Sequence, residues 1–165
     1  MATAGKNLSH YDKSILPDAS QMRFGIVVSE WNDDITNNLL KGCYNTLVEN
    51  NVREDNITVR YVPGSFELPL GAQLLIEDTS VDAVICLGCV IQGETKHFDY
   101  VCSAVSQGIM DLSLKHNKPV IFGVLTDNKK QQSIDRSGGR LGNKGDEAAI
   151  SAIKMVGFHF PREKQ

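Results

Sequence analysis

Short apolar runs that alternate with helix-like stripes limit the folds open to this sequence more than any other feature. Residues 23–28 form a nearly continuous apolar run, which is typical of a strand buried on both faces of a parallel sheet. Asn32 is then placed to cap a helix. The apolar residues Ile35, Leu39 and Cys43 follow at the spacing of one buried helix face. A strand and a helix in this order predict the beginning of a parallel sheet.

The same alternation continues along the chain. We predict further strands at residues 56–62, 82–87 and 119–125, and further helices at 68–76, 95–115, 129–136 and 146–158. Strands separated by helices pair in parallel through right-handed crossovers. The sequence therefore predicts a three-layer α/β/α sandwich of flavodoxin-like type around a four-stranded parallel sheet.

Length and composition fit one domain without a strongly charged surface. The chain has 165 residues, and 41% of them are hydrophobic, which is enough for a single buried core. We predict one domain over residues 22–165, preceded at 1–21 by a polar arm that is disordered or borrowed by a neighbouring subunit. The formal net charge of −3 provides no basic face for nucleic acid or an anionic membrane. Small molecules or other protein chains are the expected partners.

No segment predicts export or insertion into a membrane. The longest apolar stretch is interrupted by Asp82 and Gly88, and residues 1–20 lack the apolar core of a secretory signal. All four cysteines lie in apolar segments, so we expect reduced thiols in a cytoplasmic protein. Cys86 and Cys89 match C-x-x-C, but without a second pair or nearby histidines the motif favours packing over a metal or redox site.

Candidate binding residues follow the predicted strands. In open parallel sheets, ligands bind beyond the carboxyl ends of the strands, which here are residues 29–32, 63–67, 89–97 and 122–126. Trp31, the only tryptophan, is placed either to stack on a flat heterocycle or to cover the edge of the core.

The segment at 63–67 combines a turn, a hydroxyl, an aromatic ring and a carboxylate. Ser65 and nearby backbone N–H groups offer hydrogen bonds to the polar edge of a ligand. In the alternative interpretation, Ser65 only caps the next helix and Glu67 is an acid in its first turn.

The segment after the third strand contains the elements of a phosphate site. Gly93 permits close approach, Thr95 supplies a hydroxyl, and the N-terminus of a predicted helix supplies free N–H groups, although the same pattern is a common capping element. His97 follows in the first turn and can accept and donate protons near neutral pH. A lone histidine is often structural, but the place of His97 beside this segment favours proton transfer.

Cationic side chains flank a glycine-rich run near the C-terminus. Arg136 ends a predicted helix and offers a bidentate fork for phosphate, while Lys144 offers a mobile charge. The run at 137–145 departs from a P-loop because Gly145 stands where a hydroxyl is required, so a nucleoside triphosphatase is not predicted.

In chain order, these segments resemble the lumazine synthase family of riboflavin biosynthesis. The resemblance covers nearly the whole chain from Phe24, and it rests on the ordered set of motifs at 31–32, 62–69, 87–91, 93–101, 119–126 and 142–145. It implies a transferase that joins 5-amino-6-(D-ribitylamino)uracil to 3,4-dihydroxy-2-butanone 4-phosphate. The products are 6,7-dimethyl-8-ribityllumazine, phosphate and water. The resemblance implies no metal and no organic cofactor.

The resemblance also implies roles for residues of this chain. His97 would transfer protons and Glu147 would orient it, while Glu94, Thr95 and Arg136 would bind the phosphate. The pocket for the ribitylaminouracil would be formed by Trp31, Ser65, Phe66, Glu67, Cys89, Val90, Ile91, Phe122 and Lys144.

An oligomer is implied as well. Phe122, Arg136 and Lys144 would reach each site from an adjacent subunit of a homopentamer, and pentamers can assemble further into an icosahedral shell. The expected partners are further copies of the chain, the two small-molecule substrates and riboflavin synthase.

A few positions depart from the pattern of the family. Cys89 stands where threonine is frequent, Gln92 where a basic residue is common, and residues 126–129 replace the more usual Thr-Thr-Glu-Asn. Cys89 can still contribute through its backbone.

Two interpretations from other classes stay open. A flavin-binding carrier would share the fold and the stacking aromatic residue, but it would need no histidine at position 97. An inactive structural shell subunit would share the assembly, although the presence of His97, Arg136 and Lys144 argues against it.

Overall fold

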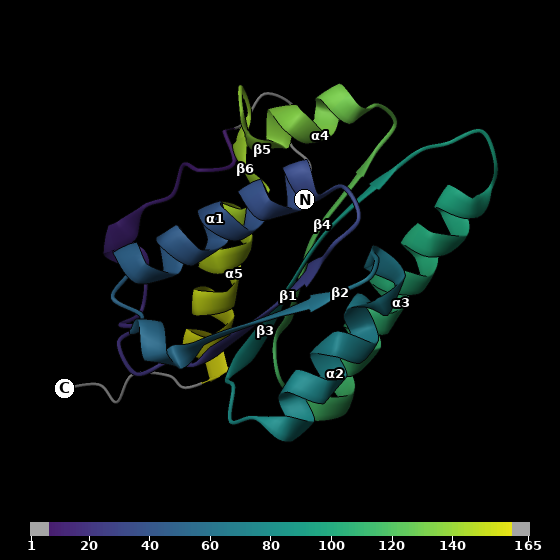
Figure 1. Ribbon diagram of the computed structural model, residues 1–165. Coiled ribbons are helices and arrows are strands. Elements are labelled where there is room, and N and C mark those ends of the chain that lie inside the picture. Colours follow the sequence, from purple (N-terminus) through teal and green to yellow (C-terminus); the bar gives the residue numbers. More distant parts are fainter. Residues whose placement is uncertain (1–6, 160–165) are drawn as a thin grey trace.

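Four parallel strands form the centre of the structure, in the spatial order β2-β1-β3-β4 (Figure 1). The computed structural model describes residues 7–159. The strands are β1 (Phe24–Ser29), β2 (Ile57–Val62), β3 (Ala83–Ile91) and β4 (Val120–Asp127). Because every pair is parallel, the carboxyl ends of all four strands lie at one edge of the sheet. The predicted four-stranded parallel sheet is confirmed.

Helices cover both faces of this sheet, as a three-layer sandwich requires (Figure 1). α1 (Asp33–Glu49) and α5 (Lys144–His159) cover one face, and α2 (Leu68–Asp78) and α3 (His97–His116) cover the other. The short helix α4 (Lys130–Arg136) follows β4. Three single-turn 3₁₀ helices complete the described helices: η1 (Lys13–Ile15), η2 (Glu54–Asn56) and η3 (Ser65–Glu67). The arrangement confirms the flavodoxin-like α/β fold predicted from the sequence.

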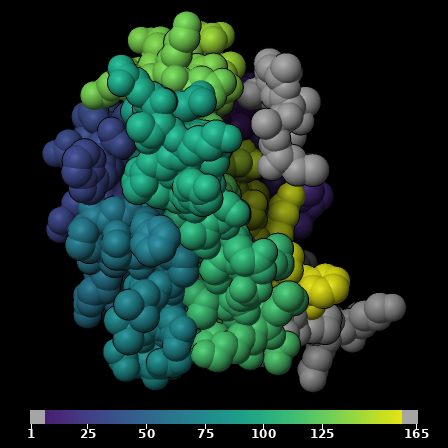
Figure 2. Space-filling view, turned by 90° about the vertical axis from the view of Figure 1, so that its right-hand side faces the viewer, coloured from purple at the N-terminus to yellow at the C-terminus, as the bar shows by residue number. Residues whose placement is uncertain are grey.

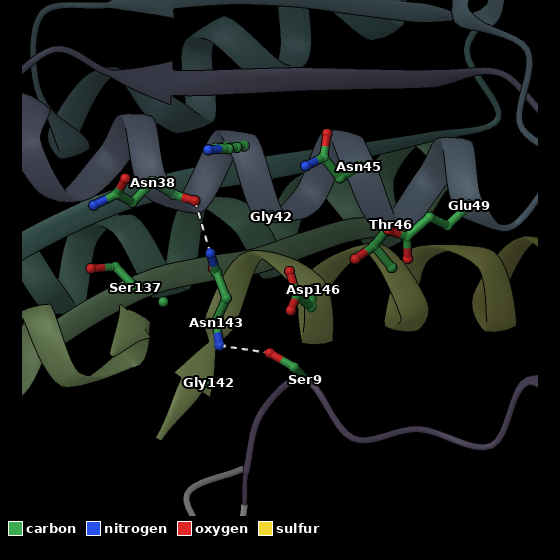
Figure 3. A pocket seen from close by; sticks show the side chains of 12 residues that line it. Ser9, Asn38, Gly42, Asn45, Thr46, Glu49, Ser137, Gly142, Asn143 and Asp146 are labelled. Carbon is green, nitrogen blue, oxygen red and sulfur yellow. Dashed lines mark hydrogen bonds between the residues drawn. The ribbon is translucent and has the colours of Figure 1, made fainter. Parts of the chain in front are cut away.

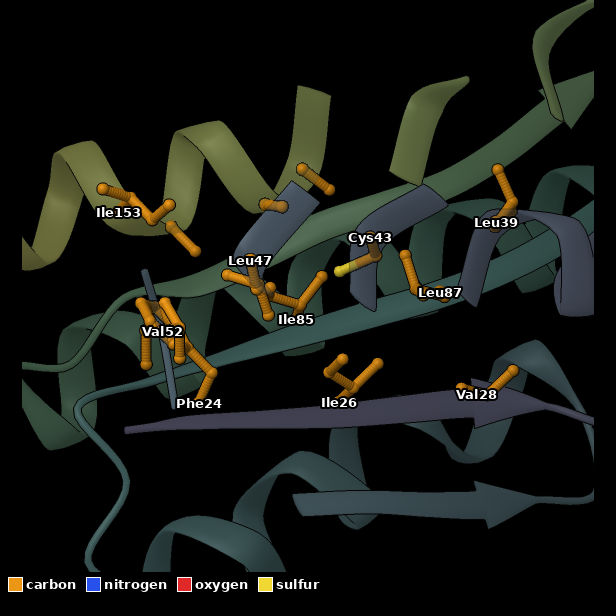
Figure 4. Packing of buried hydrophobic residues seen from close by; sticks show 14 of the residues in the cluster. Phe24, Ile26, Val28, Leu39, Cys43, Leu47, Val52, Ile85, Leu87 and Ile153 are labelled. Atoms are coloured by element: carbon orange, nitrogen blue, oxygen red, sulfur yellow. The ribbon is translucent and has the colours of Figure 1, made fainter. Parts of the chain in front are cut away.

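The central strand β1 has side chains buried on both faces. Phe24, Ile26 and Val28 point toward α1 and α5, where they pack with residues such as Leu47 (Figure 4). Val27 packs in the cluster on the opposite face, beneath α2 and α3. Burial on both faces explains why residues 23–28 read as a continuous apolar run rather than an alternating one.

The glycine-rich run at 137–145 contains a small hairpin that the sequence did not predict. β5 (Ser137–Gly139) pairs antiparallel with β6 (Gly142–Asn143). Gly138 has φ +103° and Gly142 has φ +82°, backbone conformations that favour glycine. The carboxamide oxygen of Asn143 then accepts a hydrogen bond from the N–H of Gly145 at 2.8 Å. This contact caps α5, which begins at Lys144 rather than at the predicted residue 146.

The described part of the N-terminal arm lies on its own chain. The N–H of Leu8 donates to the carbonyl oxygen of Leu141 at 2.8 Å, and the hydroxyl oxygen of Ser9 accepts from the N–H of Asn143 at 3.0 Å. Ala19 is fully buried in the cluster beneath α1 and α5. The described part of the arm is therefore held on its own chain by the β5–β6 hairpin and by the cluster beneath α1 and α5. Residues 1–6 lie outside the described residues.

Within residues 7–159, no helix is both long enough and apolar enough to cross a membrane.

Helices α1 and α5 approach each other through a backbone contact at Gly145. A β-carbon at this position would overlap with the carbonyl oxygen of Leu39 and would also crowd the backbone nitrogen of Cys43. Backbone atoms inside a helix cannot swing aside as the end of a flexible side chain can. The start of α5 can therefore lie this close to α1 only because residue 145 has no side chain.

We predict that Gly145→Ala lowers the free energy of unfolding by about 2–3 kcal/mol, because overpacking against fixed atoms is destabilising. Urea unfolding at constant protein concentration measures the change. Gly93→Ala is the matched control, since no atom lies within 4 Å of a β-carbon built there. Equal stability of the two variants would contradict the contact described above.

Candidate active site

A cavity of about 750 Å³ opens at the carboxyl ends of β1, β2 and β3. Its wall combines aromatic and aliphatic side chains with a few polar groups, which is the usual make-up of a small-molecule site. The lining residues are Trp31, Asn32, Gly64, Ser65, Phe66, Glu67, Cys89, Val90, Ile91, His97, Tyr100 and Val101. Three segments that are far apart in the sequence therefore meet in one place, as the rule for parallel sheets predicts.

Two aromatic rings at the cavity are largely open to solvent. Trp31 is 75% exposed and Phe66 is 58% exposed. Trp31 therefore does not cover the edge of the core, which was the structural alternative for this residue. Both rings are accessible to a flat ligand.

Ser65 supplies a buried hydroxyl without a partner among the described residues. The residue is 6% exposed and is the first residue of η3, which Gly64 rather than Ser65 precedes as the N-cap. Buried polar groups in proteins are nearly always hydrogen-bonded, so an unpaired one in a cavity wall indicates a place for a ligand atom or a water molecule. This geometry favours the ligand-binding interpretation of Ser65 over the capping interpretation.

Asn32 differs from its predicted role as a side-chain cap. It precedes α1, but its backbone is left-handed, with φ 60° and ψ 48°, and its side chain makes no capping hydrogen bond. Its amide instead donates to the carbonyl oxygen of Cys89 at 3.0 Å. Asn32 thus joins the ends of β1 and β3 at the cavity, a role that its position before a helix gave no reason to expect.

His97 is the first residue of α3 and lines the cavity. The helix begins two residues later than predicted, and the hydroxyl oxygen of Thr95 accepts the N–H of His97 at 3.4 Å. The N–H groups of Gly93, Glu94 and Thr95 make no hydrogen bond to the described residues. The loop before α3 therefore offers several free donors close to the histidine.

Tyr100 and Val101 also line the cavity and were not predicted as site residues. They lie three and four positions after His97 on α3. Residues at this spacing share one face of a helix, so helical periodicity counted from His97 was the signal that could have identified them.

The remaining predicted site residues do not line the cavity in a single chain. Glu94 and Thr95 lie in the exposed loop before α3, and Phe122 lies on the edge strand β4. Arg136 ends α4 and Lys144 begins α5. The structure of one chain thus brings together His97 and most of the predicted uracil pocket, but neither Phe122 nor the cationic residues.

Both cationic residues have partners on their own chain. Lys144 forms an ion pair with Glu147 at 2.9 Å, so within residues 7–159 Glu147 contacts this lysine rather than His97, its predicted partner. Nη1 of Arg136 donates to the carbonyl oxygen of Gln132 at 2.9 Å and lies 3.8 Å from a carboxylate oxygen of Asp127.

The C-x-x-C pair is a packing feature. All four cysteines are free, and Cys43, Cys86 and Cys89 are buried. Burial raises the pKa of the Cys86 thiol to about 12 and that of Cys89 to about 11, which disfavours the thiolate that metal binding and redox exchange require. No cluster of three or more His, Cys, Asp or Glu residues suited to a metal ion occurs in the described part of the chain.

A second hollow, of about 470 Å³, lies between α1, the arm and the β5–β6 hairpin (Figure 3). Asn143 makes two hydrogen bonds here: its amide donates to the carbonyl oxygen of Asn38 at 2.8 Å, and its N–H donates to the hydroxyl oxygen of Ser9 at 3.0 Å. The hollow contains no predicted site residue, and these hydrogen bonds serve to join the arm and the hairpin to α1.

The comparisons with known proteins agree on one family. The family model described as 6,7-dimethyl-8-ribityllumazine synthase matches residues 21–159, which include every residue of the cavity wall. A protein of that name from Parabacteroides distasonis is 60% identical over 158 residues, covering 96% of this chain and 99% of the relative. Another from Flavobacterium johnsoniae is 61% identical over 156 residues, covering 94% of this chain and 82% of the relative. A third, from Phocaeicola vulgatus, is 56% identical over 158 residues, covering 96% of this chain and 94% of the relative.

The buried thiol of Cys86 gives a prediction for the dependence of stability on pH. Its pKa is raised from 9.0 to about 12 in the folded chain. Between these values the unfolded chain loses the proton while the folded chain keeps it, so the stability is full below pH 9 and falls as the pH rises. We expect the midpoint of urea unfolding to fall less steeply between about pH 8 and pH 11 in Cys86→Ala than in the original chain, since alanine does not ionise. Parallel slopes would show that the thiol is not the cause.

Proposed function

The chain belongs to the 6,7-dimethyl-8-ribityllumazine synthase family, and on this basis we propose how its residues share the work of the reaction. It is a transferase of riboflavin biosynthesis that forms 6,7-dimethyl-8-ribityllumazine from 5-amino-6-(D-ribitylamino)uracil and 3,4-dihydroxy-2-butanone 4-phosphate. One observation supports the proposed site above all others. The segments after β1, β2 and β3 form a single cavity that has an exposed tryptophan on its wall and a histidine at the start of α3.

For this reaction the protein needs only to orient the two substrates and to transfer protons. The amine of the uracil is the nucleophile, and it attacks the ketone, which loses water to form an imine. Phosphate is then eliminated, and the ribityl-bearing nitrogen closes the ring onto the remaining carbonyl with loss of a second water. We propose that His97 moves the protons of these steps, since it lines the cavity and an imidazole ring can both accept and donate a proton. Binding the two substrates side by side supplies the remaining acceleration.

We propose that the uracil lies against Trp31, with its polar edge and ribityl chain near Ser65, Phe66 and Glu67. The exposed ring of Trp31 and the unpaired hydroxyl of Ser65 support this orientation. Cys89, Val90 and Ile91, at the end of β3, would form the remaining wall.

The phosphate would lie at the loop before α3. The free N–H groups of Glu94 and Thr95, together with the positive end of the α3 dipole, support an anion there. Arg136 would supply the counter-charge, and Phe122 and Lys144 would complete the uracil pocket. Because these three residues lie outside the cavity of their own chain, we assign them to the site of an adjacent subunit.

Exposed apolar side chains support a head-to-tail ring. One set of exposed apolar side chains lies on α3 and α5 and consists of Met110, Leu114, Met155 and Phe158. These four side chains line a hollow of about 760 Å³. A second set of exposed apolar side chains lies on β2 and α2. Figure 2 shows the face of the molecule that α2 and α3 form. Two unlike surfaces that fit each other give a head-to-tail contact, which forms a closed ring when the rotation between neighbouring copies is a whole fraction of a turn. We propose a homopentamer that can assemble further into a shell. The residues of the second set are Tyr61, Leu70 and Leu74.

Two further assignments concern a protein partner and the compartment. Riboflavin synthase is the proposed protein partner because it belongs to the same biosynthesis. The cytoplasm is the proposed compartment because all four cysteines are free thiols.

The first experiment is to mix the purified protein with both substrates and to follow lumazine absorbance and phosphate release together. The slow uncatalysed condensation is subtracted. Matched appearance of both products, in proportion to the protein added, is the expected result. A flavin-binding carrier would instead quench the fluorescence of Trp31 with riboflavin and form neither product, and an inactive shell subunit would assemble without forming either.

We predict that His97→Ala slows turnover about 10-fold to 100-fold, because proton transfer is lost while the substrates are still held together. His97 is exposed, so folding and assembly should not change. His10→Ala, which removes an exposed histidine of the arm, is the control. Unchanged turnover in His97→Ala would remove the residue from the mechanism.

We predict that Arg136→Ala raises the KM for the butanone phosphate about 10-fold to 100-fold, because a charge-assisted contact to phosphate is lost. The KM for the uracil should change little. The matched control is Arg53→Ala, which removes an exposed arginine paired with Asp55. A selective loss of uracil affinity would mean that the phosphate site is misplaced.

Mixed assemblies test whether Arg136 acts on an adjacent subunit. His97→Ala and Arg136→Ala chains are unfolded together and reassembled, which gives about one intact site in four if each site takes the two residues from different chains. At limiting butanone phosphate, the mixture should be more active than the same two variants assembled separately and then pooled. Equal activities would place both residues in the site of one chain.

A further inference from the structure

Two departures from the family pattern, Cys89 and Asp127, are joined in the structure through Ser133. The thiol of Cys89 donates to the hydroxyl oxygen of Ser133 at 3.4 Å, and the hydroxyl of Ser133 donates to a carboxylate oxygen of Asp127 at 2.8 Å. Ser133 is fully buried, and Cys89 belongs to the cavity wall. A continuous set of hydrogen bonds therefore runs from the wall to the end of β4.

The other carboxylate oxygen of Asp127 faces Arg136. It lies 3.8 Å from Nη1 of the guanidinium, and the carboxylate is nearly buried, with 12% of the Asp127 side chain exposed. The same Nη1 donates to the carbonyl oxygen of Gln132 at 2.9 Å, one helical turn before Arg136. One end of the guanidinium is thus held between a helix carbonyl and a carboxylate.

The donors that a phosphate needs are left free by this arrangement. Among the described residues, Nε and Nη2 of Arg136 have no partner, and the side chain is 33% exposed. A separation of 3.8 Å is too long for a hydrogen bond, so Asp127 attracts the guanidinium without occupying its donors. A free arginine side chain samples many rotamers, and holding it at one end lowers the entropy lost when it binds an anion.

We propose that Asp127 is a positioning residue for Arg136, and that Ser133 fixes the carboxylate for this purpose. The proposal rests on the function proposed above, in which Arg136 binds the phosphate of the butanone substrate. The hydrogen bond from Ser133 to one carboxylate oxygen sets the plane of the carboxylate, and the second oxygen then faces the guanidinium. Cys89 in turn holds Ser133 against the cavity wall.

Asp127→Asn is the direct test, because asparagine keeps an oxygen acceptor for Ser133 and loses the charge. We expect the KM for the butanone phosphate to rise about 3-fold to 10-fold, in the range for loss of one ion pair, with the KM for the uracil unchanged within about 2-fold. The inhibition constant of inorganic phosphate, measured as a competitor of the butanone phosphate, should rise by the same factor. Asp34→Asn, which breaks an exposed ion pair with Lys130 at the start of α4, is the control and should alter none of these constants.

A double-mutant cycle separates positioning from a general structural effect. If Asp127 acts through Arg136, Asp127→Asn should have no further effect on phosphate inhibition in a chain that already carries Arg136→Ala. Additive effects, an equal rise in both KM values, or a fall in the KM for the butanone phosphate would each overturn the proposal. A fall would mean that Asp127 competes with the phosphate for the arginine.

The controls distinguish this proposal from the function on which it rests. If the original chain forms no lumazine, the proposed function fails. If the original chain is active, and Arg136→Ala but not Asp127→Asn raises the KM for the butanone phosphate, only the positioning role fails. Light scattering checks the assembly of each variant. If Asp127→Asn does not assemble, Ser133→Ala decides, since it leaves the charge in place and should raise the same KM by a smaller factor.

Discussion

The parallel pairing of β1 with β2 and with β3 is the constraint on which the site depends. The register sets Ser29 opposite Val62 and Val28 opposite Leu87, so β1 and β2 end at the same level while β3 continues past them to Ile91. Residues that are far apart in the sequence then face one cavity without long loops to bring them there. β1 is buried along its whole length, so the part of the sheet that supports the cavity is also the part least accessible to water. A site built on such strands is held more rigidly than one built on loops alone.

Polar groups at this edge are of two kinds. Some form hydrogen bonds within the fold, as the amide of Asn32 does with the carbonyl oxygen of Cys89, and these groups are not available to a ligand. Others, such as the hydroxyl of Ser65 and the N–H groups before α3, have no partner among the described residues. A protein that supplies no nucleophile of its own needs groups of the second kind to hold two substrates in contact, while the first kind keeps the cavity in shape.

The sequence predicted the sheet, the main helices and most of the cavity wall, because long apolar runs and the strand-end rule depend on local pattern and topology. The contact of Asn32 with Cys89 was not predictable, because local pattern does not report on a hydrogen bond between residues 57 positions apart. The β5–β6 hairpin was missed because its strands are too short to show alternation. The resemblance assigned Lys144 to the site of an adjacent subunit, and Lys144 lies outside the cavity of its own chain; the apolar pattern of the sequence gave no signal for this position. The hydrogen bonds that join Cys89 and Asp127 through Ser133 were not predictable either, because the sequence does not show which of several nearby groups a helical serine binds.

The contact of α1 with α5 at Gly145 bears on how this chain can change over evolutionary time. The carbonyl oxygen of Leu39 leaves no room for a side chain at residue 145, so the first turn of α5 is fixed against α1. Lys144 and Glu147 in that turn can be replaced, but the backbone that carries them cannot easily be displaced. The shape of the cavity is therefore more easily altered at Trp31 and Phe66, whose exposed side chains project from the turn after β1 and from η3.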